Sequence, residues 1–153
     1  MGEANSIKPP EFEYGNSPSE IEHIDFTGKT LLQRTSAGTQ GIVACRGAER
    51  LYATALVTAP ATARALAAGN STTISLVAMG ENGEERTDED EMCAVHIRHL
   101  LEGRHGDPDA IRRVIQAGEA PARFLDPSRP DSPVADLAIC LDIGRYDFAI
   151  RVR

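Results

Sequence analysis

The sequence predicts an α/β fold: a three-layer sandwich with a mainly parallel sheet and helices on both faces. Two observations indicate this class. Residues 72–79, TTISLVAM, are β-branched and apolar on both faces, as in the central strand of a parallel sheet. Strand-like and helix-like patterns also alternate along the chain, which is typical of right-handed β–α–β units. The length of 153 residues indicates one α/β domain spanning positions 1–153.

The first half of the chain is expected to supply three strands and two helices of this sandwich. Residues 1–27 are rich in turn formers, and Ser17-Pro18 favours a short helix because proline suits an early helical position. Thr58 is a candidate N-cap for an alanine-rich helix that stops at Gly69-Asn70. The expected elements, in order, are a strand at 29–35, a helix at 39–46, a strand at 49–56, a helix at 58–68 and a strand at 72–79.

The second half begins with a strongly acidic stretch, in which seven carboxylates fall within residues 81–91. Thr87 and Asp90 resemble a capping box that opens a helix at Asp88. Asp107-Pro108 begins another helix, with proline near its first position. The remaining elements are helices at 88–101, 109–116 and 134–141, a proline-rich connection at 120–133, and a closing strand at 148–152.

Composition excludes several classes of partner. The net charge of -7 and pI of about 5.1 disfavour nucleic acid, because phosphate-backbone binding needs clustered Lys and Arg. No segment approaches the roughly 20 apolar residues of a membrane span, and the first ten residues lack a secretory signal. Three widely spaced cysteines are typical of reduced thiols. We therefore expect a cytoplasmic protein with neither a nucleic-acid nor a membrane partner.

Residues 35–41, TSAGTQG, form a hydroxyl-rich loop between a predicted strand and a predicted helix. Backbone N–H groups at a helix start favour an anion, and Ser and Thr hydroxyls add rotatable donors. Ordinary N-capping by Ser and Thr explains the same residues, and both interpretations stay open. The turn at Gly15–Pro18 presents Asn16 and Ser17 either to a ligand or as a plain surface turn.

Glu89 and Asp90 fall in the first turn of the predicted 88–101 helix, after the central strand. In open α/β sheets, ligands bind at the carboxyl ends of the strands. The pair is compatible with Mg²⁺ coordination, with general acid–base catalysis, or with simple stabilisation of the helix dipole. His96 and His99 lie one turn apart, but further ligands for a closed metal site are missing from the spacing.

These segments together resemble the 2-phosphosulfolactate phosphatase family. The residues that carry the resemblance are Gly15–Pro18, Gly28–Thr30, Thr35–Thr39, Ala53–Leu66, Glu89-Asp90 with Cys93-Ala94, and Cys140–Asp142 with Arg145–Asp147. The resemblance implies a Mg²⁺-dependent phosphatase that hydrolyses a small phosphorylated acid, such as 2-phosphosulfolactate in coenzyme M biosynthesis. It also implies which residues bind each group. Phosphate would be bound by Asn16, Ser17, Thr35, Ser36, Gly38 and Thr39, and Mg²⁺ by Glu89 and Asp90, with no nucleophile assigned.

Two departures from the family pattern are visible. Ala37 stands where the family commonly has Asn, and family members begin with an additional strand-containing segment. The chain is therefore expected to be an N-terminally truncated member of a larger fold, with an exposed sheet edge that favours a homo-oligomer. Two alternative functions remain. One is a catalytically inactive homologue that binds an anion or another subunit, and the other is an unrelated α/β module whose acidic loop contacts a basic partner.

Overall fold

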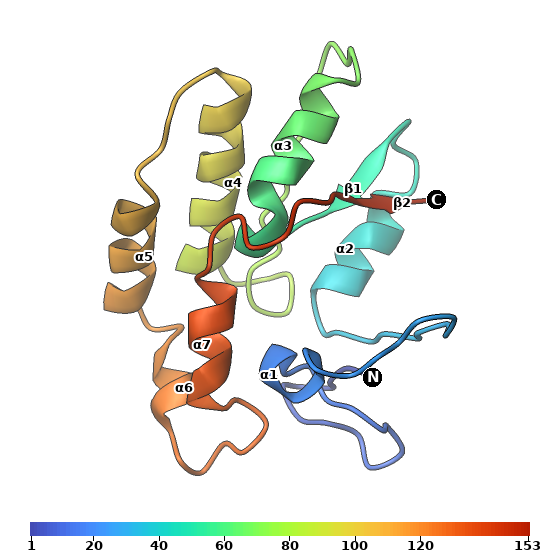
Figure 1. Cartoon of the computed structure of the whole chain (residues 1–153), viewed down its shortest axis with the longest axis vertical. Helices are drawn as coiled ribbons and strands as arrows, with labels where there is room; N and C mark the ends of the chain where they lie inside the picture. The colour runs from blue at the N-terminus through green and yellow to red at the C-terminus, as the bar shows by residue number, and fades with distance from the viewer.

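Helices dominate the computed structural model, which describes residues 1–153 (Figure 1). The elements in chain order are α1 (Pro18–Ile21), α2 (Gly38–Ala44), β1 (Leu51–Ala53), the 3₁₀ helix η1 (Leu56–Thr58), α3 (Ala59–Ala67), α4 (Asp88–Leu101), α5 (Pro108–Ala117), α6 (Ala122–Leu125), α7 (Val134–Cys140) and β2 (Ile150–Val152). None of these helices is both long and apolar enough to pass through a bilayer.

The predicted three-layer sandwich with a mainly parallel sheet is wrong. The molecule has one sheet of two strands, β1 and β2, which pair antiparallel. Leu51 lies opposite Val152, Tyr52 opposite Arg151 and Ala53 opposite Ile150. The strands expected at 49–56 and 148–152 therefore exist in shortened form, but they pair with each other and not within a parallel sheet.

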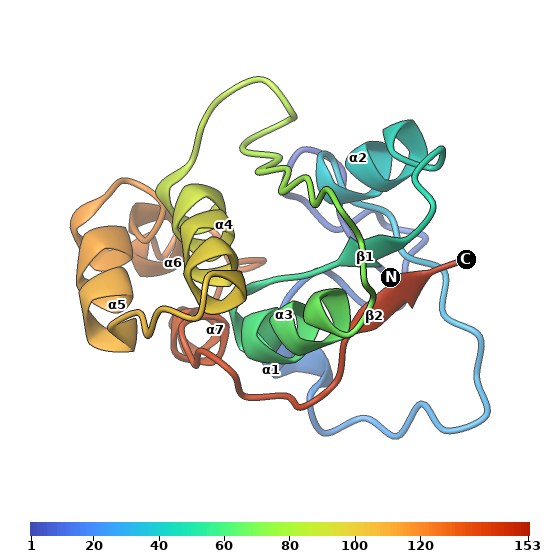
Figure 2. The same ribbon diagram turned by 90° about the horizontal axis from the view of Figure 1, so that it is seen from above.

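The segment expected to be the central strand, residues 72–79, is not a strand. It takes part in no backbone–backbone hydrogen bond, and Figure 2 shows it as a plain trace between α3 and the loop before α4. Leu76 packs on the core, whereas the side chain of Val77 is 60% exposed. A strand requires a hydrogen-bonded neighbour as well as an apolar pattern, and neither β1 nor β2 pairs with this segment.

The expected strand at 29–35 is likewise absent. Its single ladder contact is an isolated parallel bridge between Gly2 and Arg34. Leu31 and Leu32 point largely to solvent, with 48% and 82% of their surfaces exposed. A strand covered by helices on both faces would bury both leucines, so this segment also contradicts the sandwich.

The core lies where α3 packs against α4, with α5 on the other side of α4 (Figures 1 and 2). Ala59 and Ala63 are one turn apart on α3, as are Cys93 and Ile97 on α4, and all four are buried. Small alanine side chains on the facing stripe permit close approach of the two helices. The buried core is Leu56, Ala59, Ala63, Cys93, Ile97, Ile115 and Leu141.

The helix predictions are confirmed to within one or two residues at each end. One detail of the prediction is wrong, because the capping box at Thr87 does not form. Thr87 occupies the N-cap of α4 with extended backbone angles, but its hydroxyl is buried without a partner. Asp90 accepts a hydrogen bond from the backbone N–H of Gly80 at 2.7 Å, not from Thr87.

Candidate functional site

The hydroxyl-rich loop before α2 is held partly by its own threonines. The hydroxyl oxygen of Thr35 accepts a 3.0 Å hydrogen bond from the N–H of Thr39, and the Thr39 hydroxyl donates back to the Thr35 carbonyl at 3.0 Å. Gly38 has no special steric role, since an added Cβ would lie 3.5 Å from the Thr35 hydroxyl. These reciprocal bonds favour the capping interpretation for Thr35 and Thr39.

Ser36, between those threonines, holds an anionic group, the carboxylate of Glu3. Its N–H donates to Glu3 Oε1 at 2.5 Å, and its hydroxyl donates to Oε2 at 2.8 Å. The N–H of Ser6 also donates to Oε2, at 2.7 Å. Burial acts to raise the pKa of Glu3, but the hydrogen bonds from Ser6 and Ser36 outweigh it and hold that pKa below its usual value.

The predicted Asn16-Ser17 turn is engaged in the fold. Ser17 is the N-cap of α1, accepting from the N–H of Glu20 at 3.3 Å, and its own hydroxyl donates to Asp136 Oδ1 at 2.9 Å. The Ser19 N–H donates to the same carboxylate oxygen at 2.9 Å. Ser17 is therefore satisfied by protein groups, while the exposed Asn16 has one long contact of 3.4 Å, from the side-chain amide of Gln33.

The structure brings the two predicted phosphate-binding segments close together through residues 1–3. The N–H of Gly2 donates to the carbonyls of Tyr14 and Gly15, both at 3.1 Å, on the side of the Asn16 turn. The next N–H, that of Glu3, donates to the Arg34 carbonyl at 3.0 Å, on the side of the Ser36 loop. Both segments are therefore hydrogen-bonded to the same short stretch of backbone.

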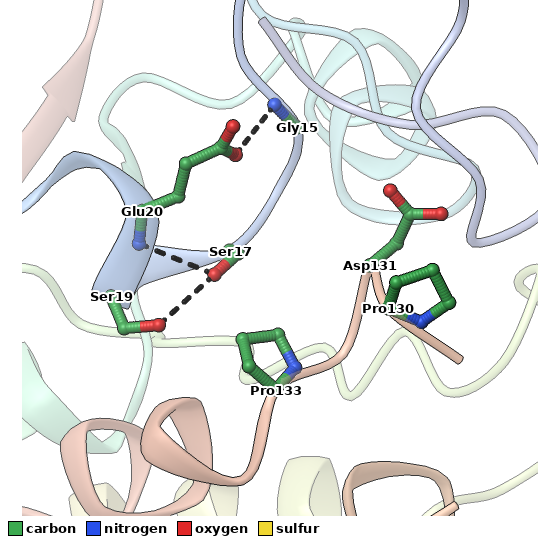
Figure 3. A pocket seen from close by; sticks show the side chains of 7 residues that line it. All are labelled: Gly15, Ser17, Ser19, Glu20, Pro130, Asp131 and Pro133. Carbon is green, nitrogen blue, oxygen red and sulfur yellow. Dashed lines mark hydrogen bonds between the residues drawn. The ribbon is translucent and has the colours of Figure 1, made fainter. Parts of the chain in front are cut away.

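A cavity of about 280 Å³ opens beside the same turn (Figure 3). Figure 3 shows Glu20, whose Oε2 accepts a 2.9 Å hydrogen bond from the Gly15 N–H, on the opposite side from Asp131. The residues that line the cavity are Gly15, Ser17, Ser19, Glu20, Pro130, Asp131 and Pro133. Two carboxylates and no basic residue make this cavity unfavourable for a bare phosphate, because like charges repel.

Glu89 and Asp90, the two predicted metal ligands on α4, lie in different environments. Asp90 is directed to the loop at Gly80. Glu89 has one carboxylate oxygen, Oε2, that is buried with no hydrogen-bond partner. The pKa of the Cys140 thiol on α7 is raised, first by desolvation, then by the charge of Asp136 and to a smaller degree by that of Glu89. Glu89 therefore lies within electrostatic reach of α7.

The donor atoms of Glu89 and Asp90 bear on whether the site suits a Mg²⁺ ion. No cluster of three or more His, Cys, Asp or Glu side chains is positioned to share a metal. Mg²⁺ commonly binds one or two carboxylates and completes its shell with waters and substrate phosphate. The unpartnered buried oxygen of Glu89 is the kind of atom that a cation would satisfy, so Glu89 fits such an ion better than Asp90 does.

The side chain of Met79, directly before the acidic loop, contacts α2. Met79, immediately before the glycine that Asp90 contacts, packs on Gly41 of α2, where an added Cβ would lie 2.3 Å from the Met79 sulfur. Gly41 is buried in the middle of α2, two residues after Thr39. The helix that follows the predicted phosphate loop is thereby joined to the loop that leads to the predicted metal ligands.

Two residues that join these segments were missed from the sequence. Asp136 is the single charged residue in the otherwise apolar α7, and this isolated acid was its available signal. Glu3 carries no comparable signal, because it stands among turn residues and its bonds to Ser36 reach a loop more than thirty residues away. His96 is buried in the core, and its Nδ1 has no hydrogen-bond partner.

Comparison with known proteins adds an independent line of evidence. The family model described as 2-phosphosulpholactate phosphatase matches residues 1–126. A probable 2-phosphosulfolactate phosphatase of Bacillus subtilis is 27% identical over 156 residues, covering 99% of this chain and 66% of that protein. Proteins of the same name from Symbiobacterium thermophilum and Thermotoga petrophila are each 31% identical, over 67% and 69% of this chain and 43% and 45% of their own lengths.

The chain thus spans just under two thirds of the Bacillus relative and less than half of the other two in the aligned regions. The matched region contains the Asn16-Ser17 turn, the Ser36 loop and the acidic start of α4. Because the family match covers most of the sequence, the chain belongs to the 2-phosphosulpholactate phosphatase family.

Proposed function

We propose that this protein is a Mg²⁺-dependent phosphatase that hydrolyses a small phosphorylated acid such as 2-phosphosulfolactate, a reaction of coenzyme M biosynthesis. Family membership and the names of the relatives support the reaction class. The observation that carries the proposal is the donor set around Ser36, where two N–H groups and a hydroxyl already bind an oxyanion, the carboxylate of Glu3.

In this proposal, the phosphate of the substrate takes the place of that carboxylate. The Ser36 N–H and hydroxyl donate to two phosphate oxygens, and the Thr35–Thr39 bonds keep the loop in shape for them. The exposed amide of Asn16, on the neighbouring turn, supplies a further donor. These groups orient the phosphorus for attack without themselves forming a covalent bond to it.

Glu89 and Asp90 would hold the metal, with Glu89 contributing its unpartnered oxygen. When bound, Mg²⁺ offsets negative charge on the phosphoryl oxygens and lowers the barrier to attack by water. Asp90 also keeps its bond to Gly80, which fixes the loop leading into α4. We further propose a homo-oligomer, since the backbone groups of residues 72–79 have no partner within the chain.

The proposal is tested by measuring phosphate release from 2-phosphosulfolactate and from p-nitrophenyl phosphate, with Mg²⁺ and with a chelator. Release that requires Mg²⁺ is expected. Glu89→Gln and Asp90→Asn should abolish the metal dependence, whereas Glu84→Gln, an exposed acid of the same loop, should leave it unchanged. A folded protein with no Mg²⁺-dependent release contradicts the proposal. Size-exclusion chromatography with light scattering tests the oligomer.

One observation favours a second candidate, an inactive homologue that binds an anion or another subunit. The oxyanion position at Ser36 is filled by the protein's own Glu3. Phosphate binding without turnover of either substrate would establish this alternative.

A further inference from the structure

We propose that Glu3 is an internal ligand of the Ser36 loop, which an incoming phosphate or other oxyanion must displace. The inference rests on the proposed function, because it assigns phosphate to the same donors. It adds a built-in competitor for that site: the protein's own acidic side chain lowers the affinity for external anions.

The competition follows from the number of donors. Glu3 uses both carboxylate oxygens, accepting from the Ser36 N–H, the Ser36 hydroxyl and the Ser6 N–H, at 2.5, 2.8 and 2.7 Å. The Ser36 hydroxyl oxygen accepts in turn from the Asn5 N–H at 3.1 Å, which fixes its orientation toward Glu3. Each N–H or O–H has one proton to donate, so the same groups cannot serve Glu3 and a phosphate together.

Charge adds to this exclusion. A carboxylate left beside a bound phosphate would repel it strongly at hydrogen-bond separation, and most strongly where burial limits screening. Glu3 is partly buried, and Arg34 is the basic residue that contributes to keeping it ionised. Binding of an external anion therefore requires the Glu3 side chain to rotate away.

The backbone places Glu3 in this position. Gly2 has a φ of +121°, and an added Cβ there would lie 2.0 Å from the Arg34 carbonyl oxygen, so the chain lies directly against the loop. Asn5 and Ser6, with φ of 54° and 63°, form a tight turn closed by hydrogen bonds between Ala4 and Ile7. This turn directs the Ser6 N–H back to the Glu3 carboxylate.

The experiment measures binding of inorganic phosphate to the full chain by titration calorimetry, without metal and at neutral pH. Glu3→Gln keeps the size of the side chain and removes its charge, and Glu11→Gln is the matched control at an exposed acid. We expect Glu3→Gln to bind phosphate at least about tenfold more tightly than the wild type, because a neutral amide is a weaker competitor for the donors. Glu11→Gln should match the wild type.

Two further variants address the origin of the gain. Adding Ser36→Ala to Glu3→Gln should remove most of the increase, because the shared hydroxyl donor is lost. Glu3→Asp, shorter by one methylene, should give an intermediate affinity, and it provides a second measurement if Glu3→Gln folds poorly.

The outcomes separate the two proposals. If the wild type binds phosphate and neither Glu3→Gln nor Glu3→Asp binds it more tightly, Glu3 is not a competitor, and the phosphatase proposal stands unaffected. If neither the wild type nor any variant binds phosphate while thermal melts show folded protein, the Ser36 loop is not a phosphate site. That result contradicts both the competition by Glu3 and the phosphate site of the phosphatase proposal.

Discussion

The Ser17 hydroxyl donates a 2.9 Å hydrogen bond to Oδ1 of Asp136, a residue 119 positions further along the chain. Asp136 is only 2% exposed, and the same oxygen accepts from the Ser19 N–H. One buried carboxylate on α7 thereby serves the first turn of α1, an arrangement that joins the two ends of the sequence. The Asn16-Ser17 turn depends on this contact for its position.

Removal of the Asp136 carboxylate is expected to destabilise the protein. Asp136→Ala should lower the free energy of unfolding by about 2–3 kcal/mol, because it leaves the buried Ser17 hydroxyl and the Ser19 N–H without an acceptor. Asp136→Asn keeps one acceptor oxygen and should lower the free energy of unfolding by a smaller amount. Urea denaturation measures both, with Glu119→Gln as a control at an exposed acid. Equal stability of Asp136→Ala and the control would contradict a stabilising role for the hydrogen bonds that Asp136 accepts.

The stability contributed by Glu3 should depend on pH. Its pKa in the folded protein lies below the usual 4.5, so its ionised form stabilises the fold above that pH. This contribution is lost as the pH falls through the lowered pKa. The difference in urea midpoint between wild type and Glu3→Gln should therefore be full above about pH 4.5 and shrink toward zero at lower pH. A difference that stays constant with pH would contradict the prediction.

The thiol of Cys93 should be unreactive in the folded protein. It is buried in the core, and this desolvation, with the charge of Asp90, raises its pKa to about 12. Little thiolate exists at neutral pH, so alkylation by iodoacetamide should wait for unfolding. Mass spectrometry of timed reactions reports each cysteine separately, and the half-buried Cys45 is the internal reference. Comparable rates at Cys93 and Cys45 under native conditions would show that the core is open.

Gly41 and Gly38 provide a matched pair of substitutions in α2. An added Cβ at Gly41 would lie 2.3 Å from the Met79 sulfur, so Gly41→Ala forces Met79 away from the helix. At Gly38 the nearest atom would be 3.5 Å away, an ordinary contact. Thermal denaturation should find Gly41→Ala less stable than Gly38→Ala by about 1 kcal/mol or more, because the overlap with Met79 outweighs the gain in helix propensity at position 41. The reverse order would exclude the packing of Met79 on α2.

Local features of the sequence predicted the helices well. Thr58 and Thr87 stand directly before α3 and α4, although neither side chain makes a capping hydrogen bond. Pro108 lies at an early helical position, and the alanine-rich stripe of α3 packs as its spacing indicates. These signals act over a few residues, so they are visible in any short window of sequence.

The sheet could not be predicted in the same way. Residues 72–79 have the composition of a central strand, but strand pairing depends on a distant partner that composition does not name. The contacts of Glu3 with Ser36 and of Ser17 with Asp136 are also long-range. The sequence indicated which loops carry hydroxyls and acids, whereas the partners of those groups came only from the structure.

The open backbone of residues 72–79 has a consequence for handling the protein. The segment carries no charge and offers free N–H and C=O groups. Four of its residues are β-branched, Thr72, Thr73, Ile74 and the exposed Val77. Such a segment is a template for intermolecular β-pairing and fibril growth. At high concentration the wild type should become thioflavin-positive over time, and Val77→Lys should delay this, because a lysine at that position places repelling charges in every added layer.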